Sequence, residues 1–311
     1  MNAISENLSW RRTRRRLRLA VRHSYNHGKS PLCREDRMPI TVTPLDAALG
    51  AEVSGLDLGD ISPADAQALR DAFLEHHVLV IHGEPIGDDD LVRFGECFGP
   101  LEMARNRSPL SSRPEVWVVS NIRMDGKLVG ALPDGEMSFH FDRIHQTQPN
   151  RAGVLHAIEI PREGGDTWFA NMCRAYETLP DATRQRLDGL TARHVYEYGS
   201  VTAGGPVSPD APRAVHPVVR TIPETGRKAL YVCRLMTDRI NELAPADSRA
   251  LIDELCDHIE SRKLVYEHKW RVGDILIWDN RCTSHARTDF SADERRLLKR
   301  VTVSDHVPPL Q

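Results

Sequence analysis

Histidine–acid pairs are the first residues in this sequence that could bind a metal. A histidine followed two residues later by Asp or Glu occurs three times, at His82/Glu84, His140/Asp142 and His258/Glu260. Composition alone predicts about two such pairs, because the chain has 14 histidines and 44 acidic residues. The motif by itself is therefore no evidence of metal binding. The secondary structure expected around each pair must show which of them could bind a metal.

Two of these pairs are poor candidates for holding one ion. His258 and Glu260 fall in a predicted helix, where residues two positions apart point in different directions. We therefore expect them on an exposed helix face. His82 and Glu84 lie on either side of a glycine at the end of an apolar run, a pattern typical of a turn with a surface carboxylate.

The third pair has the alternation of a strand. Phe139 and Phe141 alternate with His140 and Asp142. A strand would place the two polar side chains on one face and the two aromatic side chains on the other. Two ligands on one face can hold a metal, although a surface strand would show the same alternation. The pair needs further ligands before it indicates a metal site.

A third ligand and anion-binding groups follow near the end of the chain. Residues 273–281 predict a strand leading into a turn, and His285 comes shortly after them. Two histidines and one carboxylate form the ligand set of non-haem Fe(II) oxygenases, which leaves positions open for a chelating co-substrate and O2. Arg296 and Arg300 are suited to hold carboxylates through paired hydrogen bonds.

β-Strands must position these residues, with helices around them. Helices are predicted from Ser62 and Pro63 to Leu74, because serine caps a helix and proline fits the first turn, and over residues 88–98, 174–187 and 245–260. Apolar or alternating segments predict strands at residues 40–43, 78–81, 116–119, 154–156, 214–219, 229–232, 263–268, 275–277 and 299–304. This pattern favours a mainly β domain with flanking helices, of the α+β class, built on a sandwich or barrel.

The chain divides into a basic tail and one domain. Residues 1–37 hold ten Lys and Arg against three acidic residues, giving +7, so the remaining chain carries −10 of the total net charge of −3. We expect this tail to be disordered, or to be upstream sequence with Met38 as the true start, and assign it no function. No linker divides residues 38–311, and the segment near 196–212, rich in Pro and Gly, is predicted to be a lid-like insertion.

Composition limits the partners. The acidic body argues against nucleic acid, and no apolar run reaches the ~18–20 residues of a membrane-spanning helix. Six cysteines without a C-x-x-C pair argue against a zinc ribbon or disulfide framework and fit reduced thiols in the cytoplasm. We therefore expect a cytoplasmic protein that acts on a small molecule, and the sequence leaves homo-oligomerisation open.

Several blocks of sequence surround the candidate ligands. They are Phe-His-Phe-Asp at 139–142, Gly-Gly-Asp-Thr at 164–167, His-Pro-Val-Val-Arg-Thr at 216–221 and Trp-Asp-Asn-Arg at 278–281. Together they resemble the TauD/TfdA group of Fe(II)- and 2-oxoglutarate-dependent dioxygenases, from about Ile40 to His306. The first block is similar to the W-H-x-D motif of that group and departs from it at Phe139.

The resemblance implies a double-stranded β-helix, the jelly-roll or cupin-like core, with His140, Asp142 and His285 as the catalytic ligands of Fe(II). It also implies that Thr167, 27 residues after His140, and Arg296 bind 2-oxoglutarate. O2 is the second co-substrate of such enzymes. They convert 2-oxoglutarate to succinate and CO2 while the organic substrate is oxidised, by default through hydroxylation.

The resemblance says less about the substrate. Taurine dioxygenase has an asparagine where this chain has Glu136, and a phenylalanine where it has Met236, so we do not expect taurine. Arg300 matches a family arginine that can meet an acid group of the substrate, or it could form a structural ion pair. Glu136 also falls in a stretch typical of a turn. As a pair they suggest a small polar, anionic or zwitterionic substrate.

Two alternatives use the same three ligands without oxidation. One is a jelly-roll protein that binds a metal or an acid without turnover, and the other is a metal-dependent hydrolase. Arg296 and Thr167 favour the oxygenase, because a hydrolase has no need of an anchor for a co-substrate.

Overall fold

A seven-stranded sheet forms one half of the core. The computed structural model describes residues 39–105, 107–131 and 135–310, so the predicted tail lies outside the described residues. The strands run in the order β1-β2-β3-β16-β8-β18-β4, and only β2 and β3 pair in parallel. Their bounds, in that order, are Thr41–Pro44, Ala51–Ser54, Val78–Ile81, Ile275–Asp279, Ala152–Glu159, Leu297–Val303 and Trp117–Ser120.

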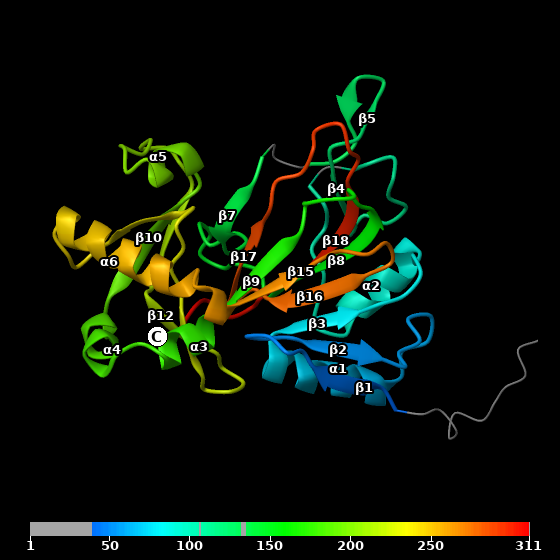
Figure 1. The fold of residues 1–311 in the computed structure, drawn as a ribbon, viewed down its shortest axis with the longest axis horizontal. Coiled ribbons are helices and arrows are strands. Elements are labelled where there is room, and N and C mark those ends of the chain that lie inside the picture. Colours follow the sequence, from blue (N-terminus) through cyan, green and yellow to red (C-terminus); the bar gives the residue numbers. More distant parts are fainter. Residues whose placement is uncertain (1–38, 106, 132–134, 311) are drawn as a thin grey trace, which may run out of the picture. The chain divides into compact units, whose positions relative to one another are not determined.

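A four-stranded sheet packs against it. Its strands run in the order β15-β9-β17-β7, with bounds Val265–His268, Thr167–Asn171, Thr283–Arg287 and Met137–His140. Phe169 of β9 and Trp278 of β16 are fully buried, with ring centroids 5.8 Å apart, in one apolar cluster with Val80 and Leu298. Alternate residues of both sheets therefore fill the space between them, as in a β-sandwich. Figure 1 shows the two sheets side by side.

Two helices cover the outer face of the larger sheet. Leu69 and Phe73 of α1 (Pro63–His76) and Phe94 of α2 (Asp88–Glu96) share a buried cluster with residues of β3, β8, β16 and β18. Ser62 caps α1, since its Oγ accepts a hydrogen bond from the backbone N–H of Asp65 at 3.1 Å. Such a cap contributes about 1 kcal/mol. Both predicted helices are confirmed, and Figure 1 shows α1 below the sheet.

A second group of elements packs against the smaller sheet. It includes a three-stranded sheet, β11-β10-β14, a pair, β12-β13, and α6. Their buried side chains form a cluster with residues of α3 (Met172–Glu177) and β7. The bounds are Arg213–Pro217, Thr191–Val195 and Thr237–Ile240 for the sheet, Val219–Thr221 and Lys228–Leu230 for the pair, Pro245–Ile259 for α6, and Arg262–Leu264 for the 3-10 helix η2.

The predicted helix over residues 174–187 is wrong as a single element. The structure has two helices there, α3 (Met172–Glu177) and α4 (Asp181–Leu187), with Pro180 at the N-cap of α4. Proline has no backbone N–H to donate and disfavours a helical residue before it. The periodicity of apolar residues hid this break.

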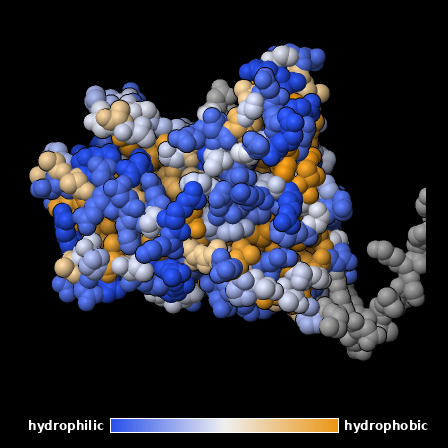
Figure 2. Space-filling view, viewed as in Figure 1, coloured by the Kyte–Doolittle hydropathy of each residue, from blue (hydrophilic) through white to orange (hydrophobic). Residues whose placement is uncertain are grey.

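Two small elements project from the same side of the domain. The segment predicted as a lid-like loop contains a short helix, α5 (Tyr198–Thr202), and a hairpin is formed by β5 (Arg123–Met124) and β6 (Lys127–Leu128). Figure 1 shows α5 and β5 at the upper left and upper right. The face seen in Figure 2 is mainly hydrophilic, with scattered hydrophobic residues. Within the described ranges, no helix is both long and apolar enough to span a membrane.

Candidate active site

Three potential metal ligands converge between β7 and β17. His140 and His285 are direct partners in the pairing of these strands, and their imidazole centroids are 4.2 Å apart. Oδ2 of Asp142 lies 3.9 Å from Nε2 of His285. One ligand atom from each of the three residues lies within 4.8 Å of the others, so the structure brings the predicted set together.

Asp142 lies in a turn and not, as predicted, on the same strand as His140. β7 ends at His140, so the two ligands do not share a strand face; Asp142 follows in a turn. The buried Asn280 holds that turn, because its Oδ1 accepts from the backbone N–H of Asp142 at 2.8 Å and its Nδ2 donates to the Asp142 carbonyl at 3.0 Å. Asn280 belongs to the Trp-Asp-Asn-Arg block at 278–281, but the sequence alone does not indicate that it positions Asp142.

The protonation states of the three groups suit a metal. Burial lowers the pKa of His140, and burial together with the charge of His140 lowers the pKa of His285 to about 3. Burial would raise the pKa of Asp142, but Arg300 and the two histidines lower it overall. At neutral pH the site therefore holds two neutral imidazoles and one carboxylate, the forms that bind metal ions.

The tautomer of His140 is also defined. Its Nδ1 lies 2.9 Å from the carbonyl oxygen of Ser138, which can only accept, so Nδ1 carries the proton and Nε2 has a free lone pair. Metal-bound histidines commonly use their second ring nitrogen in this way.

Thr167 and Arg296 line the same cavity. The cavity has a volume of about 460 Å³ and is lined by both residues and by the three potential ligands. Thr167 and Arg296 are 3% and 2% exposed. Burial and the charge of Arg287 lower the pKa of Arg296 to about 9. Its Nη2 donates to the carbonyl oxygen of Gly165 at 3.0 Å, and its Nε has no hydrogen-bond partner in the described structure. The buried guanidinium of Arg296 makes this cavity suited to an anion.

Known proteins are similar to this chain in fold and in sequence. A model described as "Taurine catabolism dioxygenase TauD, TfdA family" matches residues 41–302. The chain belongs to the TauD/TfdA family. It is an Fe(II)- and 2-oxoglutarate-dependent dioxygenase, an oxidoreductase that also consumes O2. The predictions of family, jelly-roll fold and enzyme class are therefore confirmed, and the oxygenase is favoured over the hydrolase and the non-oxidative binding protein.

Relatives and solved structures agree with this assignment. The chain is 36% identical to pentalenolactone F synthase of Streptomyces avermitilis, over 85% of this chain and 93% of that one. It is 32% identical to the 2,4-dichlorophenoxyacetate dioxygenase of Cupriavidus pinatubonensis, over 86% and 99%. The structure of AAD-2 with Mn(II) and N-oxalylglycine aligns with a TM-score of 0.75 at 28% identity, over 88% and 100%. A taurine dioxygenase from Burkholderia xenovorans aligns at 0.73, with 31% identity, over 87% and 93%.

Arg300 of this TauD/TfdA dioxygenase lies beside the potential ligands. Its Nη2 donates to Oδ2 of Asp142 at 2.6 Å and its Nη1 to Oδ1 at 3.2 Å. Its guanidinium lies over the indole of Trp278, 5.4 Å from the centroid. Arg300 lines the cavity, so both predicted interpretations, ion pair and substrate contact, remain compatible with its position.

Glu136 does not line the cavity. Its side chain is exposed, just before β7, and the described cavity lining does not include it. Other residues also line the cavity: Arg287 and Trp117, which the sequence did not indicate, and Tyr196 and Tyr198, which belong to the segment predicted as a lid-like insertion. Arg287 stands two residues after His285 on β17, so both lie on one face of that strand, but no strand was predicted there.

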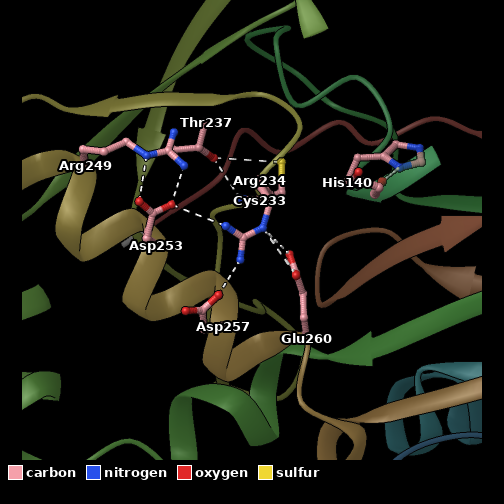
Figure 3. A network of polar contacts seen from close by, with 9 residues as sticks. His140, Cys233, Arg234, Thr237, Arg249, Asp253, Asp257 and Glu260 are labelled. Atoms are coloured by element: carbon pink, nitrogen blue, oxygen red, sulfur yellow. Dashed lines mark hydrogen bonds and ion pairs between the residues drawn. The ribbon is translucent and has the colours of Figure 1, made fainter. Parts of the chain in front are cut away.

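The segment that carries Met236 to the cavity is fixed to α6. The guanidinium of Arg234 pairs with the carboxylates of Asp253, Asp257 and Glu260 at 3.4, 2.7 and 3.2 Å (Figure 3). Met236 lines the cavity, as predicted from the resemblance. The expectation of an exposed helix face at His258 and Glu260 is wrong, because Glu260 lies in this ion-pair network and Nε2 of His258 contacts the Ala175 carbonyl at 3.0 Å.

A second group of potential metal ligands lies elsewhere. Ligand atoms of His77, Cys173 and Cys282 also lie within 4.8 Å of one another, and all three residues are buried. Sγ of Cys282 is 3.3 Å from Nδ1 of His77, and Nη1 of Arg227 is 2.9 Å from Nε2 of the same ring. Of the described residues that line the cavity, none belongs to this group.

Proposed function

We propose that His140, Asp142 and His285 hold Fe(II), and that Thr167 and Arg296 bind the distal carboxylate of 2-oxoglutarate. The observation that carries this assignment is one cavity lined both by a neutral set of two histidines and one carboxylate and by a buried guanidinium. Bound Fe(II) would supply the activation of O2 and the oxidation of the substrate, with release of succinate and CO2.

The protein residues prepare this site before any metal binds. Ser138 fixes the tautomer of His140, and Asn280 fixes the turn that carries Asp142. Such outer partners orient ligands and typically change metal affinity 10–100-fold when removed. Trp117 and Trp278 also line the cavity, and their apolar rings would help to exclude water from the region where the substrate is oxidised.

We propose a small polar or anionic substrate, with hydroxylation as the outcome. Arg300 supports an acid group, because it reaches the cavity beside Asp142, and a cation at the three ligands would compensate the Asp142 charge that Arg300 now balances. Similar proteins are named for a phenoxyacetate and for a sulfate ester, both anionic. Glu136 would act only at the entrance, since it is exposed.

The test of the reaction class is spectroscopic. Under anaerobic conditions, Fe(II) and 2-oxoglutarate together should give a weak visible charge-transfer band. A folded protein without this band would contradict the assignment of the ligands and of the co-substrate site.

The substrate is tested by a screen that follows succinate release. Arg300→Gln should reduce turnover of acidic substrates more than that of neutral ones, and Glu136→Gln should change the profile only slightly. If both variants kept the wild-type profile and rates, the determinants would lie in the 196–212 segment, which we propose to act as a lid.

We propose that the tail is dispensable and that the enzyme acts in the cytoplasm on small molecules, not on nucleic acid. The net charge of −10 outside residues 1–37 supports the last point. Deleting residues 1–37 should leave turnover and solubility near those of the full chain. A large loss of either would show that the tail packs on the domain or directs assembly.

A further inference from the structure

The buried cluster of His77, Cys173 and Cys282 has no part in the proposed mechanism. Its two cysteines come from adjacent segments, because the backbone N–H of Met172, the first residue of α3, donates to the carbonyl oxygen of Cys282 at 3.1 Å. The sulfur atoms of both cysteines and a ring nitrogen of His77 lie within 4.8 Å of one another. The two thiols are therefore close enough for a small side-chain movement to join them, as a disulfide requires.

A chain of hydrogen bonds leads through this cluster to Cys173. Nη1 of Arg227 lies 2.9 Å from Nε2 of His77, and a guanidinium can only donate. Nε2 therefore accepts, and Nδ1 carries the proton towards Sγ of Cys282, 3.3 Å away. The thiol of Cys282 in turn donates to Sγ of Cys173. Each donor thus points along the chain, and the sulfur of Cys173 is the acceptor at its end.

This arrangement makes the two cysteines unequal. The hydrogen bond from Cys282 is the largest effect on Cys173 and lowers its pKa to about 6, although burial opposes it. Burial, followed by the same hydrogen bond, raises the pKa of Cys282 well above its usual range. At neutral pH the pair therefore consists of a thiolate and a neighbouring thiol.

The backbone of His77 indicates that its side chain is needed here. His77 is the C-cap of α1 and has a φ of 66°, a left-handed conformation that glycine or asparagine usually adopts at the end of a helix. A residue with a larger side chain is disfavoured there. Unfavourable backbone conformations persist mainly where they position a functional group, and the group that His77 positions is the imidazole beside Cys282.

The other described cysteines have the opposite protonation. Cys233 and Cys256 are 2% and 1% exposed and lie near each other, but burial raises the pKa of both. Cys97 is the most exposed of the five described cysteines, and burial raises its pKa as well. Since the thiolate is the form that reacts with oxidants, Cys173 is the one described cysteine prepared for this reaction.

We propose that Cys173 and Cys282 are a modification site at which hydrogen peroxide forms a reversible disulfide. The Cys173 thiolate attacks one peroxide oxygen and the O–O bond breaks. This gives a sulfenic acid, and the second oxygen leaves as hydroxide and is protonated to water. The sulfur of Cys282 then attacks the sulfur of Cys173, the S–S bond forms and the S–O bond breaks. The hydroxyl group leaves with the thiol proton of Cys282 as a second water.

Two electrons pass from the cysteines to one peroxide in this reaction, so one peroxide gives two waters and one disulfide. Both thiols are 0% exposed, and a local opening beside the partly exposed Arg227 admits an oxidant little larger than water. The disulfide joins α3 to the residue just before β17, the strand that carries His285. In a cytoplasmic protein such bonds are usually transient and respond to the redox state.

The experiment is peptide mapping of the full chain after treatment with hydrogen peroxide at pH 7. Remaining thiols are alkylated in denaturant, and mass spectrometry measures the linked and free cysteines. A linked Cys173–Cys282 pair should form and disappear with dithiothreitol. The matched control is the buried pair Cys233 and Cys256. It should link roughly tenfold or more slowly, because a thiol with an ordinary or raised pKa is at most a few per cent thiolate at this pH.

Single variants separate the two roles. Cys282→Ser removes the second thiol but keeps a donor, so oxidation should stop at a sulfenic acid on Cys173 that dimedone traps. Cys173→Ser should leave Cys282 as a free thiol. Circular dichroism verifies that both variants fold, and the mapping of the wild type tests the disulfide without any substitution.

Three outcomes would overturn the proposal. Oxidation of the more exposed Cys97 with Cys173 and Cys282 both left free would show that access alone governs reactivity. Equally fast linkage of Cys233 and Cys256 would show that the hydrogen-bond chain confers no selectivity. A sulfenic acid on Cys282 in Cys173→Ser, with none on Cys173 in Cys282→Ser, would contradict the assignment of the thiolate.

Discussion

The two three-donor groups of this protein differ in access and protonation, although the donor atoms lie within 4.8 Å of one another in both. The group of His140, Asp142 and His285 lines a cavity, and its histidines are neutral with an available lone pair. In the group of His77, Cys173 and Cys282, Arg227 always donates, so Nε2 of His77 accepts and Nδ1 carries the proton, directed at Cys282. Proximity of donor atoms is therefore not enough for a metal site.

The two groups also differ in the charge that they can stabilise: a bound cation in the first and a thiolate in the second. Burial keeps the histidines of the first group neutral, so they do not repel a bound cation and can donate a lone pair to it. In the second group, the hydrogen bond from Cys282 is the largest effect on Cys173 and outweighs burial, so that the pKa of Cys173 is lowered to about 6. The group of His77, Cys173 and Cys282 is thus suited to a thiolate stabilised by hydrogen bonds, and the group of His140, Asp142 and His285 to a metal ion.

The largest expected effect separates the two groups by substitution. His140→Ala, Asp142→Ala and His285→Ala should each weaken Mn(II) binding by at least about 100-fold, since even outer partners cost up to that much, and should abolish turnover with the fold retained. Cys173→Ser with Cys282→Ser should leave Mn(II) affinity near wild type. Calorimetry and circular dichroism measure both quantities. Full activity in any one of the three alanine variants would remove that residue from the iron site.

The next effect concerns the two proposed co-substrate residues of the cavity, Arg296 and Thr167. Arg296→Ala should raise the Kd of 2-oxoglutarate about 10–100-fold, because a hydrogen bond to a charged group contributes about 1.5–3 kcal/mol. Thr167→Val should act in the same direction but more weakly, through loss of one neutral donor. Titration of the Mn(II)-loaded protein measures both. An unchanged Kd in the Arg296 variant would contradict the assignment.

A smaller effect tests the thiolate. The folded-state pKa of Cys173 lies below that of an unfolded thiol, so the unfolded chain binds more protons between these values and stability rises with pH. Between pH 6 and 9 the wild type should gain about 1 kcal/mol or more relative to Cys173→Ser. This contribution is lost as the pH falls through the folded pKa. Urea unfolding at several pH values measures it, and parallel profiles would show that Cys173 stays protonated.

The smallest expected effect is the pH dependence of metal binding. Ordinary histidines, with pKa near 6.5, compete with protons for a metal as the pH falls towards 6. Because the pKa of His285 is about 3 and that of His140 is lowered, Mn(II) affinity should change less than about twofold between pH 8 and 6. A steep loss over this range would mean that the site is less buried than the structure shows.

Local patterns in the sequence were sufficient to predict many of the helices and strands. Ser62 and Pro63 define the start of α1, because capping needs only neighbouring residues. Motif order along the chain was sufficient for the family and for the fold that it implies. Neither inference required distances between remote residues.

Only the tertiary structure decided how the site is assembled. Asp142 is held by Asn280, which is 138 residues away in sequence, and Arg287 meets Thr167 through the pairing of β17 with β9. The tertiary structure also shows that Glu136 is exposed and that the ligand atoms of His77, Cys173 and Cys282 lie close together. The physical reason is that hydrogen bonds, burial and pKa shifts depend on which segments pack together, whereas sequence patterns report only what neighbours along the chain impose.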